Sequence, residues 1–159
     1  MRARAASFGD FQCAHCHALV SSAHLLSGVN NRNHCPYCLW SCHLDLFAAG
    51  DRLSACKAPM KPIGLTMKKT RNKYQRDLRG ELMLVHQCTG CEALSINRIA
   101  ADDDSDTVLA VFQESLKLGQ LTYARCQGYG ILLLSEHDMD VVRAQLYGYA
   151  AEVPALHWS

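Results

Sequence analysis

The chain has 159 residues, of which 49% are hydrophobic and 19% are charged, and its formal net charge is +1. This composition predicts a folded globular protein and excludes a wholly disordered one. No apolar run reaches the roughly 18–20 residues that a membrane helix requires, so the sequence predicts no membrane association.

The first residues, 1–12, form a short basic tail without the apolar core of a signal peptide. We therefore expect a cytoplasmic protein whose cysteines stay reduced. The nine cysteines are an odd number, which also favours metal ligands over disulfides. Charge is uneven along the chain, because residues 1–98 carry 13 Lys and Arg against 6 Asp and Glu, whereas residues 99–159 carry 3 against 9.

The middle of the chain predicts a β hairpin with a basic tip. Residues 63–67 and 82–87 are apolar and strand-sized, and a basic segment lies between them. A further short strand is expected within residues 94–100. Residues 38–46 fit the start of a helix or an extended strand equally well.

The last third of the chain predicts a small α/β extension. Acidic residues at 102–106 favour the N-terminus of a helix, and residues 107–118 carry an apolar helical face. Residues 121–125 and 131–134 predict strands, and a last helix is expected over residues 136–147. We therefore predict a small α+β protein, with a β-rich domain over residues 1–104 and a helix–strand–strand–helix extension, residues 105–159.

CxxC pairs provide the clearest chemical signal in the sequence. Zinc takes four tetrahedral ligands, and a CxxC turn presents two thiolates on one tight loop. The first two pairs are separated by 18 residues, a spacing typical of zinc ribbons and treble clefs. We therefore expect a four-thiolate zinc site formed by these residues: Cys13, Cys16, Cys35 and Cys38.

A second zinc site is expected around the third CxxC pair. Its predicted ligands are His43, Cys56, Cys88 and Cys91. Three residues remain alternatives for the fourth position: His34, Cys42 and His86. Both predicted sites are closed by four protein ligands, which is typical of structural rather than catalytic zinc. The isolated Cys126 is expected to be an ordinary core cysteine.

Two enzymatic interpretations are weaker, and the sequence predicts no catalytic residue. Residues 35–38, Cys-Pro-Tyr-Cys, have the dithiol spacing of glutaredoxins, but no apolar strand precedes them and zinc would occupy both thiols. A treble-clef nuclease of the HNH type would use residues such as His34, His43 and Asp45. The sequence shows no recognisable set of open metal ligands with a general base, so this remains a third alternative.

The string Arg32-Asn33-His34-Cys35-Pro36 resembles the signature of the RNHCP domain family, small zinc-ribbon-like bacterial proteins named for these five letters. Further matching residues follow in the order that the family shows: residues 38–41, His43, Asp45, residues 50–52, Cys56, Met60, Pro62, residues 86–88, Cys91, residues 97–100, Asp102 and Asp103. The resemblance covers residues 11–104 and implies a zinc-binding fold without an assigned activity. Arg32, Asn33 and His34 would then brace the metal sites.

The sequence departs from the family pattern at three positions. Cys42 stands where a lysine-like residue is expected, and His17 and Glu92 stand where glycine usually follows a CxxC pair. Without that glycine, each turn must reach its geometry in another way, and the second zinc site is the one affected. Residues 107–159 show no resemblance.

The basic hairpin tip is the predicted functional surface. Its candidate nucleic-acid-binding residues are Lys68, Lys69, Arg71, Lys73, Tyr74, Arg76 and Arg79. Basic side chains release counterions from phosphates, and an aromatic ring stacks on unpaired bases. The leading prediction is a non-enzymatic protein with two Zn²⁺ ions that binds RNA or a ribonucleoprotein, such as the ribosome. A protein-interaction adaptor acting through residues 105–159 is the alternative, and no small-molecule substrate is evident.

Overall fold

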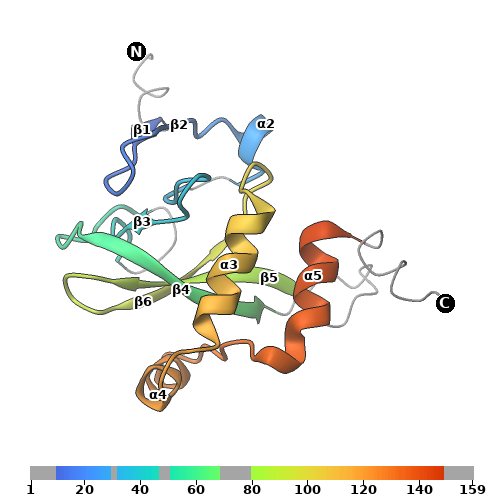
Figure 1. The fold of residues 1–159 in the computed structure, drawn as a ribbon. Helices are drawn as coiled ribbons and strands as arrows, with labels where there is room; N and C mark the ends of the chain where they lie inside the picture. Colours follow the sequence, from blue (N-terminus) through green and yellow to red (C-terminus); the bar gives the residue numbers. More distant parts are fainter. Residues whose placement is uncertain (1–9, 30–31, 47–50, 69–79, 149–159) are drawn as a thin grey trace, which may run out of the picture.

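A four-stranded antiparallel sheet lies at the centre of the computed structural model (Figure 1). Its strands occur in the order β3 (Ser41–Cys42), β4 (Pro59–Lys68), β5 (Glu81–Cys88) and β6 (Leu94–Arg98). The structure describes residues 10–29, 32–46, 51–68 and 80–148. Among these residues, no helix combines the length and apolar character needed to cross a bilayer.

The two long strands β4 and β5 confirm the predicted hairpin. They pair from Met60 opposite Cys88 to Lys68 opposite Glu81, with a register shift between Pro62 and Gly64. Most of β5 is buried because both faces of this strand are covered, which explains its continuous apolar sequence. The predicted strand at 94–100 is present as β6, and the ambiguous segment 38–46 contains the short strand β3.

A second, two-stranded sheet carries the first CxxC pair. Strands β1 (Phe11–Gln12) and β2 (Leu19–Val20) pair antiparallel on either side of the loop that holds Cys13 and Cys16. The short helix α2 (His24–Ser27) follows. This small sheet places the first metal-ligand pair at a loop held by backbone hydrogen bonds on both sides.

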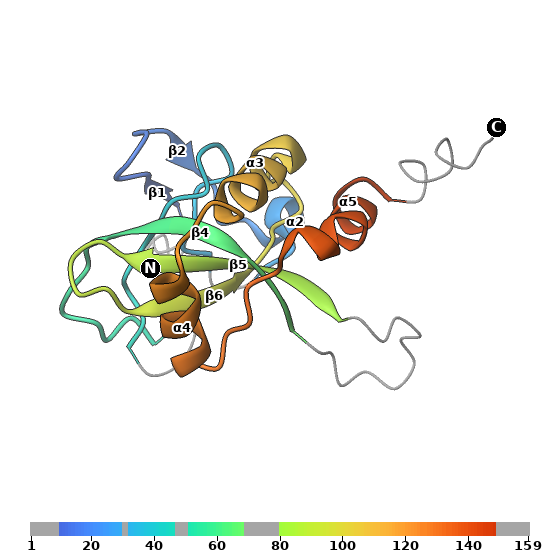
Figure 2. The same ribbon diagram turned by 60° about the horizontal axis from the view of Figure 1, so that its bottom comes forward.

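Helices cover both faces of the four-stranded sheet. Helix α3 (Ser105–Ser115) packs on β4 and begins at Asp104, whose side chain accepts a hydrogen bond from the Thr107 N–H. Helix α5 (Met139–Tyr147) follows a short 3-10 turn, η1 (Glu136–Asp138). This turn begins with a capping box formed by Ser135 and Asp138. Figure 2 shows α3 and α4 (Gln120–Gly128) on opposite sides of the strands.

One apolar core joins the sheet to α3 and α5. Leu65 of β4 and Leu84 of β5 pack together with Val108 and Phe112 of α3 and with Val142 of α5. All five side chains are buried. Helices α3 and α5 therefore complete this core and cover one face of the sheet.

The predicted strand at residues 121–125 is wrong, because this segment belongs to helix α4. A five-residue segment is too short for its period to separate a strand from a helix. In the structure Cys126 is buried and Thr122 and Tyr123 are half-buried, a spacing that forms one face of a helix. Cys126 is a core residue, as the sequence predicts.

The predicted strand at residues 131–134 is also not formed. The segment is extended alongside β4, where the Leu134 N–H donates to the Leu65 carbonyl at 2.9 Å and the Thr66 hydroxyl donates to the Leu132 carbonyl at 2.6 Å. These contacts do not make a regular ladder. Gly64 permits this close approach, because a Cβ at that position would lie 2.9 Å from the Leu133 side chain.

Candidate metal centres

Each CxxC pair begins a loop of the same backbone geometry. The N–H groups of Cys13, Cys35 and Cys88 donate to the carbonyl five residues later, at 2.8–2.9 Å. Each of these cysteine carbonyls also accepts a hydrogen bond, at 2.8–3.0 Å, from the N–H four residues later. We call these three turns the CxxC knuckles. Their hydrogen bonds hold two thiols of each loop close together.

The residue that closes each CxxC knuckle has a positive φ. The values are 66° at His17, 67° at Leu39 and 65° at Glu92. This is the backbone region in which glycine is favoured, and side chains there carry a local cost of about 1–3 kcal/mol. His17 and Glu92 therefore replace the expected glycines without a change in the shape of the turn.

The first candidate metal centre brings together the two N-terminal CxxC knuckles. Its four sulfur atoms, from Cys13, Cys16, Cys35 and Cys38, lie within 4.8 Å of one another. The Sγ atoms of Cys13 and Cys38 are 3.6 Å apart, and so are those of Cys16 and Cys35. Tetrahedral zinc with sulfur at about 2.3 Å places its ligands about 3.8 Å apart. This cluster of four sulfur donors therefore fits a zinc ion.

Burial and backbone hydrogen bonds act on these thiols in opposite directions. Burial raises the pKa of Cys35, and it also raises that of Cys38. Burial likewise acts on Cys13, but the N–H groups of Cys16 and His15 donate to its sulfur and lower its pKa below the usual value. Such N–H groups stabilise the thiolate form that a metal ion requires.

The second candidate metal centre lies where strands β3, β4 and β5 begin or end. It brings together these residues, whose ligand atoms all lie within 4.8 Å: His43, Cys56, Cys88 and Cys91. The Sγ atoms of Cys56 and Cys88 are 3.5 Å apart, and Nδ1 of His43 lies 3.4 Å from the Sγ of Cys91. Three sulfurs and one imidazole nitrogen form a donor set that suits zinc.

In this second cluster, the thiol of Cys88 has a pKa below its usual value. Burial raises its pKa, but hydrogen bonds from the N–H groups of Cys91 and Gly90 oppose that effect, and the pKa falls to about 6. The thiolate is therefore favoured at neutral pH, which suits a metal ligand.

The alternative fourth ligands have other partners. His34 contacts Asp103, as described below, and the Cys42 thiol donates to the Lys57 carbonyl at 3.2 Å. His86 is fully buried and its Nε2 lies 2.7 Å from the carbonyl oxygen of Leu39. Of these candidates, the structure places only His43 in the cluster with Cys56, Cys88 and Cys91.

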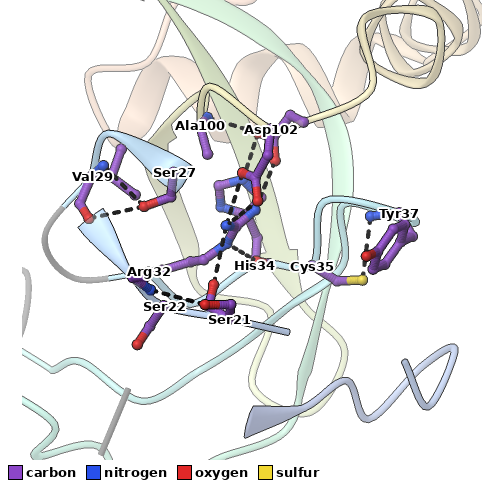
Figure 3. Close-up of polar contacts among 12 residues, drawn as sticks. Ser21, Ser22, Ser27, Val29, Arg32, His34, Cys35, Tyr37, Ala100 and Asp102 are labelled. Carbon is purple, nitrogen blue, oxygen red and sulfur yellow. Dashed lines mark hydrogen bonds and ion pairs between the residues drawn. The ribbon is translucent and has the colours of Figure 1, made fainter. Parts of the chain in front are cut away.

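A buried charge cluster lies beside the first candidate metal centre (Figure 3). We use this name for the buried Arg32, His34 and Asp103 together with Asp102, whose side chain is 32% exposed. The Arg32 guanidinium is fully buried and lies 2.8 Å from an Asp102 carboxylate oxygen and 3.2 Å from one of Asp103. Its Nε also donates to the His34 carbonyl at 3.0 Å, and an Nη atom donates to the Ser21 carbonyl at 3.3 Å. Arg32 thus braces the backbone just before Cys35.

Sequence reasoning anticipated one half of the buried charge cluster. The sequence predicts that Arg32 and His34 brace the metal sites and that residues 102–106 favour the start of a helix, but it does not pair Asp102 or Asp103 with Arg32. Asp104 does start helix α3, but Asp102 and Asp103 turn toward Arg32. The sequence contains the opposite charges, yet no local pattern shows that segments about 70 positions apart meet.

Asn33 also braces neighbouring backbone. Its side chain accepts a hydrogen bond from the Arg52 guanidinium and donates to Asp45 at 3.4 Å. Asp45 in turn accepts from the Arg52 backbone N–H at 3.0 Å. These contacts link the loop before Cys35 to the segment that leads toward Cys56.

Most of the predicted nucleic-acid-binding residues lie outside the described part of the chain. Lys68 is exposed at the end of β4. The others lie within residues 69–79, which are outside the described ranges: Lys69, Arg71, Lys73, Tyr74, Arg76 and Arg79.

Comparison with known proteins gives a match for the part of the chain that contains the CxxC pairs. No curated protein and no solved structure gives a match to the chain. The model of the RNHCP domain matches residues 8–109, more than half of the sequence, and this range contains both candidate metal centres and the buried charge cluster. The chain therefore belongs to the RNHCP domain family.

Proposed function

We propose that this protein is a non-enzymatic module that holds two structural zinc ions and binds RNA or a ribonucleoprotein through the β4–β5 hairpin. The observation that carries the proposal is the pairing of β4 with β5 up to Lys68 opposite Glu81. Residues 69–79, within the most basic segment of the sequence, connect these two paired ends. The residues that flank this segment therefore lie side by side.

The composition of the two metal centres supports a structural role for zinc. Each cluster offers four protein ligand atoms, which is the full number for tetrahedral zinc. A catalytic zinc keeps one position for water or substrate. Zinc bound in this way stabilises the folded state directly, and the reducing cytoplasm that we propose as its location keeps the thiols free for it.

The contacts of His34 argue against the nuclease alternative. Its side chain is buried and bonded to Asp103, and His43 belongs to the second cluster. Asn33 and Asp45 are bonded to each other and to Arg52. His34 is thus engaged in the fold and His43 in the second cluster, which supports a binding function.

The charge of the hairpin supports a nucleic-acid partner. Residues 68–79 carry Lys68, Lys69, Arg71, Lys73, Arg76 and Arg79, with Asp77 as their acidic residue. Each basic group that contacts a phosphate releases bound counterions, so affinity falls as salt rises. A tyrosine among them, Tyr74, suits single-stranded RNA because its ring can stack on an unpaired base.

A salt titration of RNA binding tests the proposal. We expect single-stranded RNA to bind at low salt, with a logarithmic salt slope that falls by about 0.7 for each phosphate contact removed. The hairpin variant replaces four residues with Gln: Lys68, Lys69, Arg71 and Lys73. A charge-matched control replaces four basic residues elsewhere with Gln: Lys61, Lys117, Arg125 and Arg143. Equal loss in both variants, or no binding by the wild type, would reject the hairpin as the RNA-binding surface.

A protein-interaction adaptor is the second candidate function. The observation in its favour is exposed apolar surface after helix α3, where Leu121 is 87% exposed and Leu132 is 68% exposed. An adaptor would retain its partner after nuclease treatment, whereas a partner held through RNA would be released. Purification with and without nuclease therefore separates the two functions.

A further inference from the structure

A cavity of about 250 Å³ lies between the first CxxC knuckle and strand β3. Neither candidate metal centre accounts for it, although Cys13 contributes to its wall. The residues that matter for its chemistry are Gln12, Asn33, Trp40, Ser41 and Arg52. They bring an indole ring, two amides, one hydroxyl and one guanidinium to the cavity, which Phe11 and the buried Arg32 also line.

Ser41 in the cavity wall has an unsatisfied hydroxyl. The residue is 6% exposed, and within the described residues its Oγ is the buried side-chain polar atom that has no hydrogen-bond partner. Buried polar groups are nearly always hydrogen-bonded, because a group that loses its hydrogen bonds to water on burial needs a partner to replace them. A partner for this hydroxyl is therefore expected from outside the described residues, as a water molecule or a ligand.

Trp40 provides a flat apolar surface at the same place. Its ring is stacked on His15, with centroids 4.0 Å apart and an interplanar angle of 3°. The stack fixes the orientation of the indole and covers one of its faces. A ligand of the cavity can therefore use at most the other face or the ring edge.

The polar groups of the cavity wall favour a neutral or anionic ligand over a cation. No carboxylate is among the described residues that line the cavity. The Arg52 side chain is 39% exposed, and one of its Nη atoms donates to the Asn33 amide and lies 3.5 Å from a carboxylate oxygen of Asp45, which leaves other N–H groups of the guanidinium for a ligand. The Gln12 amide donates to the His17 carbonyl at 3.1 Å, which uses one of its four hydrogen-bonding positions. Amides both donate and accept, which matches the edge of a nucleobase, and a guanidinium matches a phosphate.

We infer that this cavity binds one unpaired nucleobase of a single-stranded RNA, with Trp40 against the base, Ser41 as a hydrogen-bonding partner and Arg52 toward the phosphate. A cavity of about 150 Å³ holds one benzene ring, so this larger cavity suits a single base rather than a dinucleotide. The inference rests on the proposed function, since it assigns a base-binding site to a protein proposed to bind RNA. It adds a site remote in sequence from the basic hairpin.

Tryptophan fluorescence tests the inference in the zinc-loaded full-length protein. The chain has two tryptophans, so Trp158→Phe leaves Trp40 as the single reporter. We expect adenosine 5′-monophosphate and a hexa-adenylate RNA to quench this fluorescence saturably, and ribose 5-phosphate, which lacks a base, to leave it unchanged. Equal quenching by ribose 5-phosphate would mean that the cavity binds phosphate only, and it would overturn the inference.

Two variants examine the cavity in this single-tryptophan protein. Ser41→Ala removes a hydroxyl that has no hydrogen-bond partner among the described residues, so we expect unchanged stability but about 3- to 10-fold weaker nucleotide binding. Arg52→Gln should weaken the nucleotide more than adenosine, which has no phosphate. Arg143→Gln removes the same charge from the exposed surface of α5 and should change neither nucleotide binding nor adenosine binding. If Ser41→Ala and Arg52→Gln both bind like the parent protein, the inference is wrong.

Failure of the cavity and failure of the proposed function give different results. RNA binding that depends on the basic hairpin but leaves Trp40 unquenched would retain the proposed function and reject the base-binding cavity. Absence of both RNA binding and quenching would reject both. Quenching by nucleotide that persists in the four-residue hairpin variant is the expected result.

Discussion

The Nε2 atom of His34 lies 2.7 Å from an oxygen of the Asp103 carboxylate, and both side chains are buried. The same oxygen accepts a hydrogen bond from the Ala100 N–H at 2.8 Å, while the other oxygen lies 3.2 Å from the Arg32 guanidinium. Asp103 therefore fixes the loop before Cys35 against the segment that enters helix α3. This one carboxylate joins the metal-binding region to the helical region.

Replacement of this carboxylate should destabilise the protein strongly. Asp103→Asn retains the shape of the side chain but removes its charge, so the buried Arg32 keeps only Asp102 as an acidic partner. Loss of one member of a buried ion pair costs about 3–5 kcal/mol in the free energy of unfolding. Urea unfolding of the zinc-loaded protein measures the change. Asp140→Asn, on the exposed side of α5, should stay within about 0.5 kcal/mol of wild type, and equal stability of the two variants would contradict the prediction.

His86 is a neutral, fully hydrogen-bonded core residue. Because a carbonyl oxygen only accepts, its Nε2 carries the proton and donates to Leu39 at 2.7 Å. Its Nδ1 accepts from the side-chain amide of Asn97 at 2.9 Å. Burial lowers the pKa of His86 to about 3, from an ordinary value of 6.5. The folded protein therefore resists protonation at this site.

This lowered pKa predicts an acid-sensitive contribution to stability. Between about pH 6.5 and pH 3 the unfolded chain binds a proton at His86 that the folded protein does not bind. The free energy of unfolding should therefore fall as the pH falls through this window, by up to about 1.4 kcal/mol per unit. His86→Gln should lack this component, and its remaining pH dependence comes from groups shared with the wild type. Parallel stability curves for the two proteins between pH 6.5 and 5 would disprove the assignment.

Metal content should separate the two candidate metal centres. We expect two zinc ions per chain in the wild type, and His43→Ala should reduce the count to one or weaken the second ion markedly. Cys42→Ser is the matched control, because it changes the neighbouring residue, which lies outside the four-residue cluster. Elemental analysis of the purified proteins gives the count. If His43→Ala kept two tightly bound ions and Cys42→Ser lost one, the fourth ligand of the second metal centre would be Cys42 and not His43.

Gly90 should be essential for the packing of the third CxxC knuckle. A Cβ at this position would lie 2.9 Å from the Cβ of Ala58 and 3.3 Å from the sulfur of Cys56. Gly90→Ala must therefore displace Ala58 and crowds the Cys56 sulfur, so we expect weaker binding of the second metal ion and a cost of about 1–3 kcal/mol. Gly128→Ala is the control, since its Cβ meets nothing within 4 Å. Competition with a chelator measures the metal affinity, which should be unchanged in the control.

The sequence alone identified the parts of the protein that depend on local spacing. The CxxC pairs, with His43 and Cys56, are the residues that the structure brings within 4.8 Å in two groups. The β4–β5 hairpin and the helices α3 and α5 were also predictable, because strand-sized apolar runs, helical apolar periodicity and capping residues are properties of short segments.

Only the tertiary structure decided which distant segments meet. Helix α4 was predicted as a strand because a five-residue segment carries too little periodicity, and its identity depends on packing of Cys126. The acidic residues 102 and 103 became partners of Arg32 through a contact across about 70 positions. The cavity beside Trp40 and Ser41 arises between two strands of different sheets. Such contacts depend on the three-dimensional path of the chain, which one sequence does not encode in any local pattern.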